Sequence, residues 1–135
     1  MTMWRFRCLP LLAVLVVLGC GKTGPKVVPV SGRVTLDNKP LANADVTFTP
    51  DGADANTLES AGRTDDQGRF TLQTVQDKAN GAAVGTHKVR ISLIERGTTI
   101  VNRVPKEYNQ NTTLSFTVPP AGTTEANFDL KSKGK

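Results

Sequence analysis

Cys20 is the residue of this 135-residue chain whose surroundings most clearly specify a reaction. It follows an unbroken apolar run from Cys8 to Leu18, with two arginines ahead of the run and Gly19 directly before the thiol. A charged start, an apolar middle and a small residue at the cleavage point are typical of a secretory signal peptide. The run is shorter than the ~20 residues that a membrane-spanning helix needs. We therefore predict a signal peptide over residues 1–19, removed by cleavage before Cys20.

The four residues from Val17 to Cys20 resemble the lipobox of bacterial lipoproteins. The resemblance implies that a lipid is attached to the Cys20 sulfur after cleavage and anchors the chain in a membrane of the cell envelope. Residues 20–28 are then the lipidated cysteine and a tether containing glycine and proline, which discourage helix. Gly21 is not the aspartate that retains lipoproteins in the inner membrane of some bacteria, which favours the outer membrane.

The other reactive side chains do not form a recognisable catalytic set. The chain has one histidine, His87, and its second cysteine, Cys8, would leave with the signal peptide. Nucleophilic catalysis needs a nucleophile, an adjacent base and a group that orients the base, and a zinc site needs several nitrogen or sulfur ligands. We therefore expect no enzyme, no zinc site and no disulfide. We interpret His87 as a half-buried ring at the rim of the core.

Carboxylates provide the strongest case for a metal, because calcium is bound by several oxygen ligands. Five acidic residues lie in or near predicted loops: Asp51, Asp54, Glu59, Asp65 and Asp66. Their spacing is not that of an EF-hand, and aspartate is common in turns because it bonds to the local backbone. We expect no cofactor and no metal centre, and a weak calcium site stays open. A carboxylate pair for glycoside hydrolysis would need a cleft, for which the short predicted loops leave little chain.

From Pro29 onward, apolar and polar residues alternate, which is the pattern of strands with one buried face. Seven runs show this alternation or lie between turn signals, at residues 30–37, 46–49, 60–64, 70–73, 88–93, 114–118 and 126–131. No stretch has helical periodicity over three turns. The predicted fold is all-β: a seven-stranded antiparallel Greek-key β-sandwich over residues 29–131, followed by a frayed tail at 132–135.

The inward side of these strands forms the predicted core. Its members are Val30, Val34, Leu36, Val46, Phe48, Phe70, Leu72, Val89, Ile91, Leu93, Leu114, Phe116, Val118, Phe128 and Leu130. We expect its centre to be formed by Phe48, Phe70, Val89, Ile91, Phe116 and Phe128. At residues 65–68, Asp65 can accept hydrogen bonds within its own turn, and Gly68 can adopt the positive φ of a hairpin bulge.

Residues 95–112, which we call the contact loop, follow no regular pattern. An unstructured segment this long inside a compact domain is often functional. Within it, residues 98–101 are predicted either to extend the preceding strand or to form an edge segment. We predict Arg103, Lys106 and Tyr108 as residues of a possible contact surface, with Tyr108 also packing as an anchor for the loop.

The chain carries 17 basic and 12 acidic residues, a net charge of +5. Cleavage would remove two arginines, so the mature protein is less basic than the precursor. Basic residues do not gather on one predicted face, and we expect no nucleic-acid partner. Lysines do gather at the tail, at Lys131, Lys133 and Lys135. We interpret them as a solvated terminus, with a weak contact to anionic headgroups as the alternative.

Four motifs in sequence carry a resemblance to a known family. The run VSGRVTLDNKPLANADVTF at residues 30–48 resembles the opening of carboxypeptidase-regulatory-like domains, with V-x-G-x-V, K-P-L and A-x-V-x-F in order. TDDQGRF at 64–70 is similar to their T-D-x-x-G-x-F turn. GAAVGTHKVRI at 81–91 and VPKEY at 104–108 resemble segments of a group of small bacterial lipoproteins, although His87 replaces the usual aromatic residue. The resemblance covers residues 28–131.

The resemblance implies a transthyretin-like β-sandwich and a class of function. In carboxypeptidases such domains are non-catalytic companions, and elsewhere they are structural or adhesive modules. It therefore implies a non-enzymatic, lipid-anchored module of the cell envelope that contacts an envelope protein or polymer. A function from another class stays open: a small-ligand carrier in a transthyretin-like oligomer, because transthyretin binds its ligand between subunits.

Overall fold

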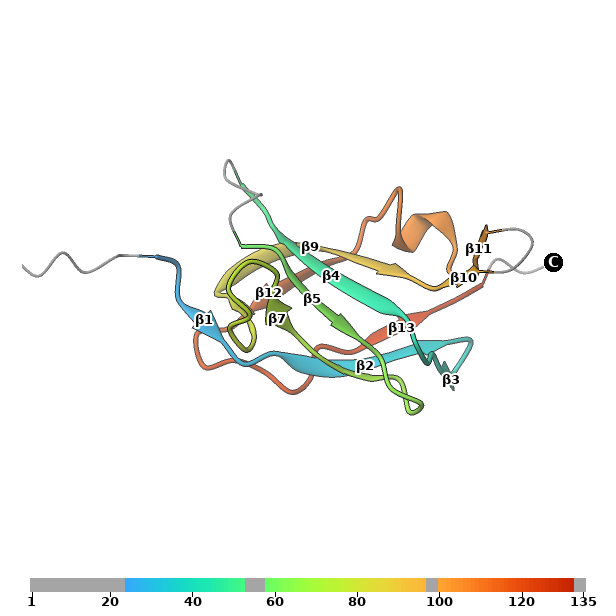
Figure 1. The fold of residues 1–135 in the computed structure, drawn as a ribbon, viewed down its shortest axis with the longest axis horizontal. Coiled ribbons are helices and arrows are strands. Elements are labelled where there is room, and N and C mark those ends of the chain that lie inside the picture. Colours follow the sequence, from blue (N-terminus) through green and yellow to red (C-terminus); the bar gives the residue numbers. More distant parts are fainter. Residues whose placement is uncertain (1–23, 53–57, 97–99, 133–135) are drawn as a thin grey trace, which may run out of the picture.

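The computed structural model describes residues 24–52, 58–96 and 100–132 (Figure 1). The predicted signal peptide, Cys20 and the first residues of the tether lie outside the described residues. The described part is all-β, as predicted, and forms two facing layers in the manner of a β-sandwich. Its only helical segment is one 3₁₀ turn, η1 (Lys106–Tyr108). Within the described residues, no helix has the length and apolarity to cross a bilayer.

The first layer is a five-stranded antiparallel sheet. In spatial order its strands are β12 (Ser115–Val118), β9 (Gly85–Ser92), β4 (Asp45–Pro50), β5 (Ser60–Arg63) and β7 (Gln73–Thr74). The second layer is built around β2, and its strands are β13 (Phe128–Leu130), β2 (Ser31–Leu36), β3 (Lys39–Pro40) and β6 (Arg69–Thr71). Two further pairs flank the layers: β1 (Val27–Val28) with β8 (Ala82–Ala83), and β10 (Ile94–Arg96) with β11 (Ile100–Asn102).

One extended run, residues 69–74, belongs to both layers. Its first part, β6, pairs with β2, whereas its second part, β7, pairs with β5. The Leu72 N–H between them donates to the Val30 carbonyl at 2.9 Å, and the Leu72 side chain is fully buried. The run therefore links the two sheets along one side, and the predicted strand at 70–73 is divided between them.

The topology differs from the prediction in two respects. β13 runs parallel to β2, with Phe128 opposite Val34 and Leu130 opposite Leu36, whereas every pair was expected to be antiparallel. Residues 119–127 connect β12 in the first layer to β13 in the second layer. After this connection β13 runs in the same direction as β2. The described residues also form thirteen short strands, because several runs of alternation are divided by turns and by changes of partner.

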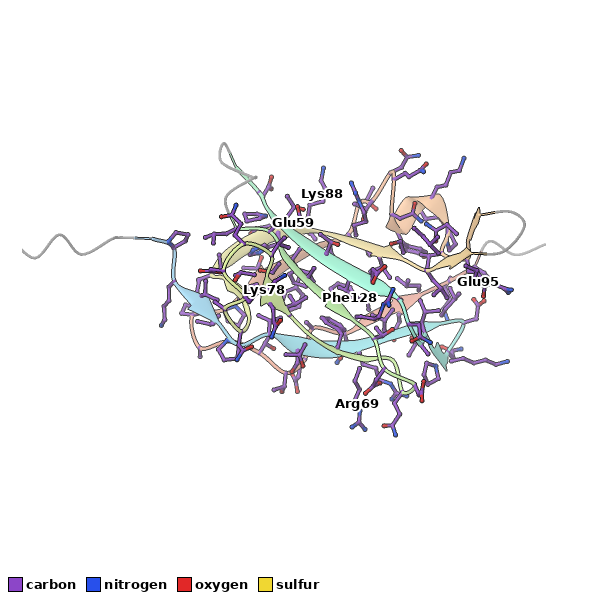
Figure 2. All side chains as sticks on the ribbon, viewed as in Figure 1. Glu59, Arg69, Lys78, Lys88, Glu95 and Phe128 are labelled. Atoms are coloured by element: carbon purple, nitrogen blue, oxygen red, sulfur yellow. The ribbon has the colours of Figure 1, made fainter. Side chains whose placement is uncertain are left out.

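The core lies between the layers and is centred on aromatic rings. The Phe48 ring centroid lies 6.0 Å from that of Phe128 and 5.8 Å from that of Phe116, while Phe70 stacks on Phe128 at 6.4 Å. Figure 2 shows Phe128 between the two layers. Phe116 lies at the margin of this cluster, partly exposed, because β12 is an edge strand.

Most of the predicted inward residues are buried. Leu36, Leu93, Leu114 and Phe116 are partly buried and pack against the core from strand ends and from the edge strand. The core also contains Val104, which lies in the contact loop and is 2% exposed. Local alternation did not identify Val104, because it lies outside any strand.

His87 is fully buried, at 1% exposure, and not half-buried as predicted. Its Nδ1 lies 3.0 Å from the Gly85 carbonyl oxygen. Because a carbonyl can only accept, Nδ1 carries the proton, and Nε2 is an acceptor with no hydrogen-bond partner. The ring packs 5.7 Å from Phe48, so burial disfavours the charged form and lowers the pKa of His87 from its usual 6.5.

The buried histidine predicts acid sensitivity. Because the folded-state pKa of His87 is below 6.5, the unfolded state binds more protons as the pH falls through that value. The stabilisation by neutral His87 is therefore complete above pH 6.5 and is lost progressively below it. We expect the free energy of unfolding, measured by chemical denaturation, to fall between about pH 7.5 and pH 5. The decline should be smaller in His87→Phe, and equal declines in the two proteins would contradict this account.

Candidate functional site

The contact loop begins as a short hairpin at the end of β9. β10 pairs with β11 in antiparallel register, with Ile94 opposite Asn102 and Glu95 opposite Val101. Of the segment expected to be an extension or an edge, residues 100 and 101 belong to β11, while 98 and 99 lie outside the described residues. The hairpin accounts for much of the segment in which the sequence shows no clear pattern.

Asn102 ties this hairpin to the body of the protein. Its Oδ1 accepts the backbone N–H groups of Leu93, at 3.2 Å, and Val104, at 3.1 Å. The Arg103 N–H also donates to the Leu93 carbonyl at 3.0 Å. These bonds hold the start and the end of the hairpin together, so that Val104 enters the core directly after it.

Asn109 fixes the next part of the contact loop. It is 3% exposed, and its amide nitrogen donates to the carbonyls of Val104, at 2.9 Å, and Pro105, at 3.0 Å. Its Oδ1 in turn accepts the Gln110 N–H at 2.6 Å. One buried side chain thus bonds to three backbone groups around η1, of which the Pro105 carbonyl also accepts the Tyr108 N–H at 3.0 Å. Residues 102–110 of the contact loop are therefore held in place by internal hydrogen bonds.

The structure separates the three predicted contact residues into two groups. Arg103 and Lys106 are exposed and line a hollow of about 360 Å³ formed by residues 102–107. The Arg103 Nε lies 2.8 Å from a Glu95 carboxylate oxygen. Tyr108 is instead turned toward the core, and its hydroxyl accepts the Lys131 N–H at 3.3 Å. Glu107 also lines the hollow. The surface that could meet a partner is therefore polar and carries charges of both signs, with Tyr108 packed beneath it.

The chain segment after β13 is also held at this end of the molecule. The Ser132 N–H donates to Asp37 at 2.9 Å, and its hydroxyl bonds to the other Asp37 oxygen. These two bonds hold the pKa of Asp37 below its ordinary 3.8. Lys131 donates through Nζ to Asn38 at 3.0 Å. The tail thus bonds to the turn between β2 and β3 at residues 131 and 132, while Lys133 and Lys135 lie outside the described residues.

The remaining sequence-predicted residues lie elsewhere. Asp65 Oδ1 accepts the N–H groups of Gln67 and Arg69, each at 2.9 Å, and Gly68 has a φ of 76°. Both residues therefore shape the turn between β5 and β6, in which Asp66 is exposed. Among the described residues, no three histidine, cysteine, aspartate or glutamate side chains are placed to hold a metal. Asp54, one of the acids considered for calcium, lies outside them.

The family comparison covers most of these elements. A family model described as "Domain of unknown function (DUF6795)" matches residues 30–114, more than half of the chain. The chain belongs to the DUF6795 family. The match extends from the bridge residue Val30 through the contact loop and ends just before β12. The comparisons with curated proteins and with solved structures yield no match.

Asn109 and Asn102 were not singled out from sequence, although both lie near prolines and other turn-forming residues. Their role depends on carbonyl and amide groups brought together by the hairpin. Asn109 is buried, which is unusual for asparagine and indicates a structural role, whereas Asn102 is exposed and its role is seen only from its hydrogen bonds.

Removal of the Asn109 amide provides a test of this structure. In Asn109→Ala the Val104 carbonyl loses the Asn109 donor, while the Pro105 carbonyl keeps only the Tyr108 N–H. We therefore expect a loss of about 1–3 kcal/mol in the free energy of unfolding. Asn111→Ala is the matched control, because Asn111 is exposed and its side chain takes part in none of these bonds. Chemical denaturation of both variants measures the difference. Equal stability of the two variants would show that Asn109 does not fix the loop.

Proposed function

We propose that this DUF6795 protein is a non-enzymatic, lipid-anchored module of the bacterial cell envelope that contacts another envelope component through its contact loop. The proposal includes cleavage before Cys20, lipid attachment to that cysteine and a location at the outer membrane. It also includes a transthyretin-like arrangement of the sandwich, which the two layers and the shared run 69–74 support. The partner is an envelope protein or polymer, and the charges of both signs around Arg103 and Lys106 favour one with a polar, charged surface.

The placement of the two ends of the molecule carries the proposal. The described chain begins beside β1 at one end of the long axis, whereas β10, β11 and η1 lie at the other end (Figure 1). A chain held to a membrane through its N-terminal segment would therefore present the contact loop away from the attachment point. The internal bonds of Asn102 and Asn109 support a binding role, because an ordered surface loses little conformational entropy on association.

The positions of the reactive side chains support a non-enzymatic role. The His87 ring is buried between the two layers and bonds to the Gly85 carbonyl, away from the contact loop. A general base must reach the proton that it abstracts, and a fully buried imidazole against Phe48 has no access to a substrate. On the contact loop, Glu95 is held in an ion pair with Arg103.

The anchor is tested by replacing its attachment atom. In Cys20→Ala no sulfur is available for lipid attachment, so we expect the protein to leave the membrane pellet or to accumulate as uncleaved precursor. Fractionation of expressing cells, followed by mass spectrometry of the N-terminus, distinguishes these products from the lipidated wild type. A wild-type N-terminus at Cys20 with a free thiol would contradict the proposal.

The contact surface is tested by site-specific photocrosslinking in intact cells. A photoreactive residue at position 106 should give a discrete adduct, whereas the same residue at position 88, an exposed lysine on β9, should not. Arg103→Glu should remove the adduct by reversing the charge beside position 106, while Arg90→Glu on β9 should leave it unchanged. The same adducts from positions 106 and 88 would contradict the assignment of this surface.

A further inference from the structure

The outer face of the second layer carries a second polar surface, separate from the contact loop. Along β2, Ser31 and Arg33 alternate with buried residues and face outward, as do Arg69 and Thr71 on β6. Figure 2 shows the Arg69 side chain beyond β2, on the side away from the first layer. Two exposed arginines, Arg33 and Arg69, therefore lie on neighbouring strands of this face.

The strand register places the two arginines directly opposite each other. The Val34 N–H donates to the Gly68 carbonyl at 2.8 Å, and the Leu72 N–H donates to the Val30 carbonyl at 2.9 Å. Because hydrogen-bonded and non-hydrogen-bonded pairs alternate along an antiparallel ladder, Arg33 and Arg69 form a non-hydrogen-bonded pair. In such pairs the side chains approach most closely, and like charges directly opposite are destabilising.

Neither arginine has a carboxylate partner among the described residues. The ion pairs found there join Arg63 to Asp45 and Arg103 to Glu95. Arg33 instead donates through Nε to the Gln67 carbonyl at 3.0 Å. Two acids on neighbouring elements accept neutral donors: Asp65 accepts backbone N–H groups, and Asp129 accepts the Thr35 hydroxyl at 2.7 Å. Among the described residues, therefore, neither guanidinium group is held in an ion pair.

A hollow of about 280 Å³ lies between these arginines and the chain that precedes β13. Its lining residues are Ser31, Gly32, Arg33, Arg69, Phe70, Thr71, Thr124 and Asn127. The polar groups are hydroxyls, guanidinium groups and the Asn127 amide, whose Oδ1 already accepts the Arg33 N–H at 3.1 Å. The hollow is thus rich in hydrogen-bond donors and has no acidic residue in its lining.

The wall of this hollow is fixed by close backbone contact. Gly32 lies against Ala126 so tightly that a Cβ at position 32 would come within 2.0 Å of the Ala126 carbonyl oxygen. The Ala126 N–H also donates to the Ser31 carbonyl at 3.1 Å. Thr124, two residues before Ala126, and Asn127, directly after it, are therefore held over β2. A preformed set of donors of this kind can bind a ligand without first ordering a loop.

We propose that this hollow binds a phosphate group, free or as part of a lipid headgroup, between Arg33 and Arg69. Guanidinium groups form paired hydrogen bonds with phosphate oxygens, and phosphate can carry two negative charges, which would balance the two arginines. The hydroxyls of Ser31, Thr71 and Thr124 supply further donors around the same space. The site lies on a different face from the contact loop and does not depend on the function proposed for that loop.

The test is a titration of the purified full chain, in non-ionic detergent, with inorganic phosphate at constant ionic strength. We expect saturable binding by calorimetry, with amide NMR shifts at Thr71 and Thr124. Arg33→Gln and Arg69→Gln should each weaken binding by about tenfold to a hundredfold. Arg90→Gln is the matched control, since Arg90 is an exposed strand arginine opposite Thr47. Equal affinity of Arg69→Gln and Arg90→Gln, or shifts elsewhere on the protein, would overturn the proposal.

A second probe distinguishes the two sources of phosphate. Dimethyl phosphate reproduces the diester of a lipid headgroup and carries one charge, whereas inorganic phosphate represents the free anion. Binding of dimethyl phosphate, alone or together with inorganic phosphate, shows that the site accepts diesters such as headgroups. Binding of inorganic phosphate alone assigns the site to free phosphate. Binding of neither probe would overturn the proposal.

Thermal unfolding tests the unbalanced charge pair itself, without any ligand. In phosphate-free buffer of low ionic strength, Arg69→Gln should melt at a higher temperature than the wild type, because it removes the like-charge contact. High salt should reduce this difference by screening, and a lower melting temperature for Arg69→Gln at low salt would contradict the premise.

Discussion

The edge-on contact between Phe48 in one layer and Phe128 in the other is the interaction on which the rest of the structure depends. The two ring centroids are 6.0 Å apart, and both Phe116 and Phe70 pack against this pair. Phe128 takes part because β13 lies beside β2, with Phe128 opposite the buried Val34. The DUF6795 match ends at residue 114, so the matched segment alone does not contain the strand that completes the core.

Residues 30–131 show how far a local pattern can predict a fold. Alternation located the main strands because side chains on a strand point to opposite faces in turn, which depends only on neighbouring residues. The parallel direction of β13 and the division of residues 69–74 between two layers depend on which distant strand is the partner. Alternation carries no information on partners, so the antiparallel expectation was wrong for β13.

The candidate contact surface was predicted only in part, for a related reason. Arg103 and Lys106 were identified because charged residues in an irregular segment are expected at the surface, and both are exposed. Order in the same segment comes from Asn102 and Asn109, whose side chains replace missing backbone partners. An asparagine in a loop sequence is equally compatible with solvent exposure. The structural role of Asn109 is identified only from its position, because its amide nitrogen lies within hydrogen-bond distance of the Val104 and Pro105 carbonyls.

Packing of the core determines the register that places Arg33 opposite Arg69. Val34, Phe70 and Leu72 face inward, and a slip of one residue between β2 and β6 would expose them and bury the arginines. The register is therefore fixed by burial, and the repulsion between Arg33 and Arg69 cannot be relieved by sliding the strands. A nearby carboxylate would relieve it at little structural cost, as Asp45 does for Arg63. Since no ion pair among the described residues includes Arg33 or Arg69, an external anion can take this place, and the fixed donors beside the pair suit phosphate.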